Sequence, residues 1–310
     1  MNLVDEVIRG DPRAIARAIS MVEDGADDLP LLSAGLFEHA GRAHTVGLTG
    51  APGVGKSTIA GELVRMARER ERTVAVLAID PTSPFSGGAL LGDRLRMQVH
   101  ATDPGVYIRS MATRGHLGGM ALAAPEAVRI LDAAGRDLVV VETVGVGQAE
   151  VDVAAATDTT IVVVAPGWGD AVQVAKAGIL EIADVFVVNK ADREGVDVAV
   201  RDLRQMLQMG AERAWTPPVV TMTAAEAAGA GELWAAVEEH RAHLVSTGEL
   251  ERARRDRVLR EVEALAAEGG RRRAREALAA DPDLVEDLAA RRTDPYRAAA
   301  ILIERIAVGP

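Results

Sequence analysis

The chain has 310 residues, of which 48% are hydrophobic, and its formal net charge is −11 at pH 7. An acidic protein repels the phosphate backbone, so general nucleic-acid binding is disfavoured. The chain contains no cysteine, which excludes disulfides, thiolate metal sites and cysteine nucleophiles. The acidic N-terminal segment has no signal-like apolar run, and the other apolar runs are too short to span a membrane. A cytoplasmic protein without membrane or nucleic-acid partners is therefore expected.

Residues 1–42 are predicted to be helical. Asp11 precedes Pro12, and this pair has the pattern of a helix N-cap followed by proline at the first helical position.

Seven β-rich runs follow, and helical patterns separate most of them. Several of these runs are almost entirely apolar, which is typical of strands buried on both faces of a parallel sheet. The alternation predicts βαβ units, and therefore an α/β fold with a mostly parallel central sheet flanked by helices. The expected strands are residues 45–49, 73–79, 106–110, 137–142, 159–164, 185–189 and 218–222.

The β pattern stops near residue 230, and the remaining chain has a helical period with many charges. Val258, Val262 and Leu265 fall on one face of a helix that is expected to break at Gly269 and Gly270. Two Asp-Pro pairs, at 281–282 and 294–295, are expected to begin two further short helices.

His240 and His243 lie three residues apart on a predicted helix and could contact one metal ion. Because no third ligand is in sight, we interpret them as a surface pair.

The string GAPGVGKST at residues 50–58 has the spacing of a phosphate-binding loop. It follows a predicted strand and precedes a helix, so its backbone N–H groups and the helix N-terminus would face phosphate oxygens. Lys56 is expected to reach the β- and γ-phosphates as a catalytic residue, and Ser57 to offer its hydroxyl to Mg²⁺. The expected nucleotide-binding residues here are Gly50, Ala51, Pro52, Gly53, Val54, Gly55, Lys56, Ser57 and Thr58.

Three acidic residues could complete the magnesium site. Asp80 and Glu142 end predicted strands, at the sheet edge where ligands bind in open α/β proteins. Asp93 lies in the string GGALLGDRLRM, and its spacing alone favours neither a functional role nor a plain turn role.

The string Asn189-Lys190-Ala191-Asp192 at a strand end indicates a guanine nucleotide. The carboxylate of Asp192 can accept from N1–H and from the 2-amino group of guanine. Adenine lacks these donors in that arrangement and would leave the carboxylate unpaired, which is costly. Lys190 would pack along the ring, and Asn189 would hold the loops together. A backbone N–H for the guanine oxygen is expected from Thr223, Ala224 or Ala225.

The string ETVGVGQAE, which begins at Glu142, corresponds to the usual Asp-x-x-Gly element of such proteins. Gly145 would sense the γ-phosphate through its N–H, so its loop is predicted to be a switch that triphosphate orders. Glutamate has a longer arm than aspartate and could contact metal-bound water instead of the metal.

Together these strings resemble the MeaB/ArgK/MMAA group of P-loop GTPases. The resemblance runs from the N-terminal helices to the end of the chain. The matching strings are GAPGVGKST, AIDPTSPFSGGALLGDRLRM, RGHLGG, ETVGVGQAE, AKAGILEIADVFVVNKAD and DPYRAA. The resemblance implies a homodimeric GTPase that uses GTP/GDP and Mg²⁺. It also implies a chaperone that gates adenosylcobalamin delivery from an adenosyltransferase and protects an acyl-CoA mutase, typically methylmalonyl-CoA mutase.

The resemblance also implies residue roles and domain limits. Asp80, Asp93 and Glu142 would belong to the metal and water site, and Arg96 would be a mobile residue near the phosphates that, with Lys56, Glu142 and Asp93, serves catalysis. Asp170, Gln173 and Lys176 would form a further switch. The expected parts are an N-terminal helical segment (1–42), a P-loop GTPase domain (43–246) and a C-terminal helical dimerisation arm (247–310).

Two other functions stay open. One is an ArgK-type kinase that acts on a periplasmic amino-acid-binding protein, against which the guanine string argues. The other is a nickel metallochaperone GTPase, against which the absence of cysteine and the six scattered histidines argue.

Overall fold

The computed structural model describes residues 2–80, 102–112, 120–143, 149–167, 179–210 and 213–308. The chain divides into two compact units, Met1–Arg257 and Val258–Pro310. No helix among the described residues is both long and apolar enough to cross a membrane.

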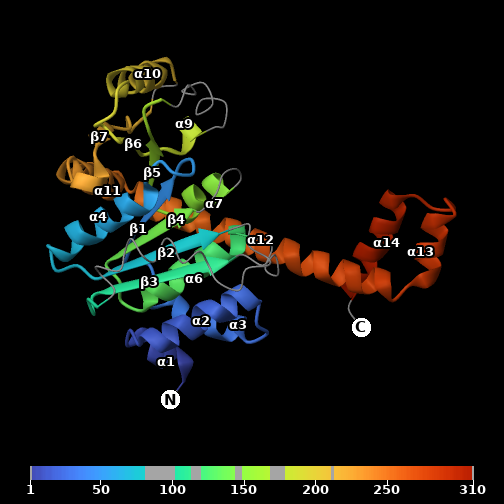
Figure 1. Cartoon of the computed structure of the whole chain (residues 1–310). Helices are drawn as coiled ribbons and strands as arrows, with labels where there is room; N and C mark the ends of the chain where they lie inside the picture. Colours follow the sequence, from blue (N-terminus) through green and yellow to red (C-terminus); the bar gives the residue numbers. More distant parts are fainter. Residues whose placement is uncertain are drawn as a thin grey trace. The chain divides into compact units, whose positions relative to one another are not determined.

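The first unit is built around a parallel sheet of seven strands in the order β3-β2-β4-β1-β5-β6-β7 (Figure 1). Every pairing between neighbouring strands is parallel. All seven expected strands are confirmed, and so is the α/β fold. The strands are β1 (His44–Thr49), β2 (Val74–Asp80), β3 (Val106–Ala112), β4 (Leu138–Thr143), β5 (Thr159–Val164), β6 (Val185–Asn189) and β7 (Val219–Met222).

Helices cover both faces of this sheet, which explains why several of its strands are almost entirely apolar. In β2, Val74 and Val76 belong to one buried cluster, whereas Ala75 and Leu77 belong to the other. Among the described residues, the helices that follow β1 and lie wholly in the first unit are α4 (Lys56–Arg68), α6 (Met120–Ala133), α7 (Ala149–Ala156), α9 (Ile179–Ile182), α10 (Val196–Met209) and α11 (Ala230–Ser246), with the short 3₁₀ helix η2 (Ala224–Glu226).

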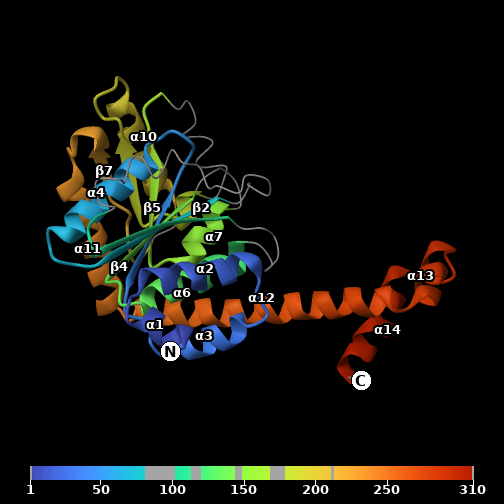
Figure 2. The same ribbon diagram turned by 60° about the horizontal axis from the view of Figure 1, so that its bottom comes forward.

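The N-terminal segment forms α1 (Leu3–Ile8), α2 (Pro12–Asp24) and α3 (Leu29–Phe37), which pack with α6 on one face of the sheet (Figure 2). The predicted N-cap is confirmed, because the Asp11 carboxylate accepts from the N–H groups of Arg13 and Ala14 at 2.8 and 2.9 Å. Arg109 of β3 donates to Glu23 of α2 at 2.6 Å and fastens this layer to the sheet edge.

The helix α12 (Glu249–Ala279) runs through Gly269 and Gly270, so the expected break there is wrong. Glycine inside a helix costs about 1 kcal/mol relative to alanine, which does not end a long helix of good helix formers.

Two short helices follow, α13 (Pro282–Ala289) and α14 (Pro295–Val308), and both begin at an Asp-Pro pair as predicted. Asp281 accepts from the N–H of Leu284 at 3.0 Å as a helix cap. Among the described residues of this second unit, the buried apolar ones are Leu284, Ala298 and Leu302.

The interpretation of His240 and His243 as a surface pair is wrong. His240 is only 2% exposed, and its Nδ1 lies 2.9 Å from Thr159 Oγ1 at the amino end of β5. His243 is partly buried against the Trp215 ring, at 5.2 Å between centroids. No cluster of metal-ligating side chains occurs around either histidine or elsewhere within the described ranges.

Candidate functional site

The loop between β1 and α4 lies close against the neighbouring strands. Gly50 has a φ of +133°, and a Cβ there would stand 2.2 Å from the carbonyl oxygen of Val163 in β5. Gly55 has a φ of +103°, and a Cβ there would stand 2.2 Å from Nδ2 of Asn189. Both positions need glycine because the backbone is left-handed and has no room for a side chain. The loop is therefore held at the carboxyl edge of the sheet, with α4 beginning at Lys56.

Lys56 is 6% exposed and folds back over its own loop. Its Nζ donates to the carbonyl oxygens of Gly50 and Ala51 at 2.6 and 3.1 Å. An ammonium group bonds more strongly to a charged oxygen than to a neutral carbonyl. A phosphate that approaches this loop therefore meets a cation already positioned at its mouth.

Ser57 and Glu142 meet at the same edge. The Ser57 hydroxyl donates to Oε1 of Glu142 at 2.6 Å. Glu142 is the second-to-last residue of β4 and is 2% exposed. The neighbouring strand β2 pairs with β4 in parallel, and its residue Ala78 lies opposite Glu142. Asp80, the last residue of β2, therefore lies at the same edge of the sheet. The side chain of Asp80 is outside the described part of the structure. A hydroxyl and carboxylates are the hard oxygen ligands that Mg²⁺ prefers, so this donor set fits the ion.

Asn189 joins the phosphate loop to the segment after β7. Its Nδ2 donates to the carbonyl oxygen of Val54 at 2.7 Å, and its Oδ1 accepts from the N–H of Ala224 at 3.0 Å. Lys190 adds a second link, because its Nζ donates to the carbonyl oxygen of Gly53 at 2.6 Å. The structure thus brings the predicted phosphate loop and the predicted guanine string together.

The remaining guanine-side residues are placed next to these. Asp192 follows β6 by three residues and is exposed, so its carboxylate is accessible. The N–H of Thr223 donates to Ala228 at 3.0 Å, and the N–H of Ala224 is used by Asn189. Of the predicted string, Ala225 is therefore the candidate donor to the guanine oxygen.

Several predicted residues cannot be placed. Those that lie outside the described residues are Asp93, Arg96, Gly145, Asp170, Gln173 and Lys176.

One feature that supports the site was missed at the level of the sequence. A Cβ at Gly47 in β1 would stand 2.6 Å from Val153 of α7 and 2.7 Å from Thr157 Oγ1. Gly47 thus lets α7, which follows the predicted γ-phosphate loop along the chain, lie directly on β1. A glycine inside an otherwise apolar strand was the available signal, because it often marks close backbone approach.

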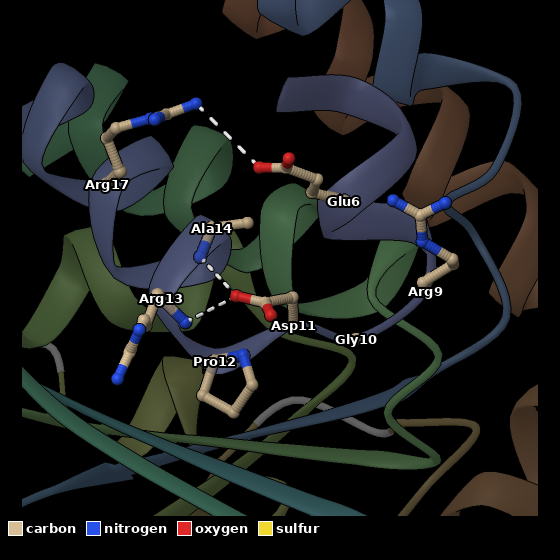
Figure 3. A pocket seen from close by; sticks show the side chains of 8 residues that line it. All are labelled: Glu6, Arg9, Gly10, Asp11, Pro12, Arg13, Ala14 and Arg17. Atoms are coloured by element: carbon tan, nitrogen blue, oxygen red, sulfur yellow. Dashed lines mark hydrogen bonds and ion pairs between the residues drawn. The ribbon is translucent and has the colours of Figure 1, made fainter. Parts of the chain in front are cut away.

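A pocket of about 710 Å³ lies elsewhere, in the N-terminal helices, and it contains no predicted site residue. Figure 3 shows that its arginines, Arg9, Arg13 and Arg17, point in different directions, while the Asp11 carboxylate in it caps α2. This arrangement does not form a converging anion site.

Comparison with known proteins agrees with the geometry of the carboxyl edge. The family model described as methylmalonyl Co-A mutase-associated GTPase MeaB matches residues 15–279. A Pyrococcus horikoshii protein named as a GTPase is 45% identical over 309 residues, which cover 98% of this chain and 98% of that protein. The GTPase ArgK of Escherichia coli is 36% identical over 255 residues, which cover 79% of this chain and 77% of ArgK.

A crystal structure of a LAO/AO transport system kinase has the same fold, with a TM-score of 0.70 at 24% identity. The match covers 98% of this chain and 96% of that one. The fold, the phosphate loop joined to the guanine string, and the family match over most of the chain lead to one conclusion. The chain belongs to the MeaB/ArgK/MMAA family of P-loop GTPases and is a GTP hydrolase.

Proposed function

We propose that this GTPase is a chaperone that gates adenosylcobalamin loading of an acyl-CoA mutase, in the first place methylmalonyl-CoA mutase, and protects that enzyme. The observation that carries the proposal is the match of a mutase-associated GTPase family over residues 15–279. An adenosyltransferase that supplies the cofactor would be a further partner. The reaction is hydrolysis of GTP to GDP and phosphate in the cytoplasm.

One set of residues would bind the phosphates of the nucleotide, and another set would bind its base. Lys56 holds the β- and γ-phosphates together with the loop amides, and Asp192 accepts from the guanine base. Asn189 and Lys190 tie the two halves together through Val54 and Gly53. The proposed binding set is the loop 50–58, Gly145, Asn189, Lys190, Asp192 and the backbone of 223–225.

Mg²⁺ would be held by Ser57 and Glu142, which already lie in contact, and by Asp80 and Asp93. The ion would neutralise phosphate charge. The residues of this chain then act mainly by positioning, because phosphoryl transfer in such sites depends on alignment and charge. Arg96 is the proposed mobile cation near the phosphates, and Asp170, Gln173 and Lys176 are the proposed second switch.

The C-terminal segment 247–310 is the proposed dimerisation arm. Leu259, Val262 and Leu265 of α12 are 55%, 57% and 48% exposed, which is unusual for large apolar side chains that recur along one helix. A second copy of the chain would cover them.

GTP turnover by the purified protein tests the proposal, measured alone and with purified methylmalonyl-CoA mutase from the same source. We expect the mutase to accelerate turnover, and Lys56→Ala to lower both the basal and the accelerated rate by about 10²–10³-fold. If methylmalonyl-CoA mutase does not change the turnover rate but another adenosylcobalamin-dependent acyl-CoA mutase raises it, that other mutase is the partner. Turnover that responds to no such mutase would contradict the chaperone function.

A further inference from the structure

A buried aspartate at the amino edge of the sheet joins three segments of the chain. Asp158 stands between α7 and β5, and its side chain is 0% exposed. Its carboxylate accepts from the N–H of Thr45 at 3.1 Å, from Nη2 of Arg254 at 2.6 Å and from Nη1 of Arg257 at 3.2 Å. The two arginines lie one turn apart in the first part of α12.

Arg257 also closes the end of α7. Its Nη2 donates to the carbonyl oxygen of Thr157 at 2.7 Å, and its Nε donates to that of Ala155 at 3.1 Å. The last carbonyl groups of a helix have no partner within the helix, and a cation is favoured beside them. The C-terminal end of α7 is therefore bound directly to α12.

Arg254 holds the other side of the cluster. Its Nη2 donates to the carbonyl oxygen of Ala43 at 2.7 Å, and its Nη1 donates to that of Gly41, just before β1. Burial by itself would raise the pKa of Asp158, but the hydrogen bond from Arg254 and the charges of Arg257 and Arg254 lower it to about 2. The carboxylate thus stays ionised at neutral pH, and the contact persists.

This connection has a particular position in the chain. At its other end, α7 begins at Ala149, shortly after Glu142 and the predicted γ-phosphate sensor Gly145. From Arg257, α12 continues as one helix to Ala279 in the second unit. Buried ion pairs add little net stability over apolar packing, so what they contribute here is fixed geometry.

We propose that Arg257 is a positioning residue that ties α7 to α12. This proposal rests on the proposed GTPase switch. A nucleotide-dependent movement of α7 then reaches the helix that continues into the C-terminal unit. The reason is geometric: hydrogen bonds weaken steeply once donor and acceptor separate or tilt. The end of α7 therefore moves together with α12 or loses these contacts. Arg254 supports the link by fixing Asp158 to the entry of β1.

Hydrogen–deuterium exchange of the full-length protein tests this link, with GDP and with a non-hydrolysable GTP analogue. In the wild type we expect the exchange of both α7 and α12 to differ between the two nucleotides. In Arg257→Ala the difference should persist in α7 and fall at least threefold in α12. A purely structural role would instead loosen α12 equally in both nucleotide states.

The matched control is Arg255→Ala, because Arg255 is on the same helix, has a side chain that is 71% exposed and lies 3.7 Å from its neighbour Asp256. This variant should behave as the wild type. If Arg257→Ala does not fold, Arg257→Lys keeps the charge near Asp158 but loses the fork that reaches both carbonyls.

An α12 difference that survives in the Arg257 variant, or that is absent in the wild type while α7 responds, overturns the link. An α7 that does not respond to the nucleotide in the wild type overturns the proposed switch itself.

Discussion

At the carboxyl edge of the sheet, polar groups make contacts that a ligand can replace, whereas at the amino edge they are tied to one another. Lys56 donates to carbonyl groups of its own loop, and Ser57 donates to Glu142. At the amino edge, Asp158 binds two arginines. The same strand serves both edges, since β1 begins at His44 and leads into the phosphate loop.

The difference explains how one sheet can be both a binding site and an anchor. Buried polar groups need partners, and an anchor satisfies them within the chain. A nucleotide site instead keeps positioned polar groups, such as the Lys56 ammonium on neutral carbonyl oxygens, whose protein contacts phosphate or base can replace. Substitutions at the two edges should therefore affect different quantities, namely stability at one and nucleotide binding at the other.

The largest effect is expected from Asp158→Asn at the amino edge. The change leaves Arg254 and Arg257 half-buried without their counter-charge, so the free energy of unfolding should fall by about 3–5 kcal/mol. Urea unfolding measures this. Asp256→Asn is the control, because that carboxylate is 53% exposed and its loss should cost less than about 1 kcal/mol. A loss at Asp158 as small as that of the control would contradict the anchoring role.

Lys56→Ala at the carboxyl edge should act on turnover instead. Removal of a preorganised cation from a phosphoryl-transfer site is expected to lower kcat by about 10²–10³-fold, as for other preorganised donors. The unfolding free energy should change by no more than about 1 kcal/mol, since the carbonyl groups it leaves can bond water. Arg65→Ala, on the same helix but paired with Glu62 at 2.9 Å, is the control for both measurements. A variant that unfolds easily but still turns over GTP would reverse the comparison.

A pH effect on stability should come from a second buried network at the amino edge. Thr159 Oγ1 lies 2.9 Å from His44 Nε2 and 2.9 Å from His240 Nδ1, and His240 Nε2 lies 3.4 Å from Asp184. Burial lowers the pKa of both histidines to about 4 and raises that of Asp184 to about 7.

The sign follows from the protons that each state binds. Between the native histidine pKa of about 4 and the ordinary 6.5, unfolding adds two protons to the imidazoles and removes one from Asp184. Unfolding therefore takes up one proton overall, so the free energy of unfolding rises by about 1.4 kcal/mol per pH unit in this window. Above it, stability should fall as pH rises towards 7 and Asp184 ionises.

Asp184→Asn sharpens this prediction, because it removes the carboxyl proton that is released on unfolding and that offsets one of the two protons taken up by the histidines. The slope below pH 6.5 should then double to about 2.7 kcal/mol per unit, and the decline near pH 7 should vanish. Urea unfolding at a series of pH values measures both slopes. Equal slopes in the two proteins would show that Asp184 does not carry a proton in the native state.

The smallest effect is expected in α12. Gly269→Ala and Gly270→Ala should each stabilise the helix by about 0.5–1 kcal/mol, because nothing described lies within 4 Å of an added Cβ. Thermal unfolding measures the gain, and a loss at either position would place Gly269 and Gly270 inside the surface that the proposed second copy covers. The same substitution at Gly55 should instead weaken nucleotide binding, because the new Cβ would collide with Asn189.

Local patterns in the sequence were sufficient to predict the sheet and to place the phosphate-loop string and the guanine string at its carboxyl edge. A β-rich run marked every strand, and the motifs in GAPGVGKST and in Asn189–Asp192 are defined by residues that are neighbours along the chain. Asn189 was expected to hold the loops together, and the structure shows its partner in the phosphate loop to be the carbonyl oxygen of Val54.

The amino edge could not be predicted in this way. Asp158 and Arg254 are 96 residues apart, and neither belongs to a recognisable motif. His240 reads as a surface residue because its helix carries many charges, and only the tertiary packing against β5 shows that it is buried. The continuity of α12 through two glycines depends on the summed propensity of its neighbours, which a single-residue rule does not capture.

The measurement that tests the account most directly is competition for bound fluorescent GDP by GTP, ITP and ATP, on the wild type and on Asp192→Asn. ITP lacks only the 2-amino group of guanine. We predict that GTP competes best, ITP less well and ATP least in the wild type, and that Asp192→Asn loses most of the preference for GTP over ITP. ATP that competes as well as GTP, or a preference that Asp192→Asn leaves unchanged, would contradict the assignment of the carboxyl edge as a guanine-nucleotide site.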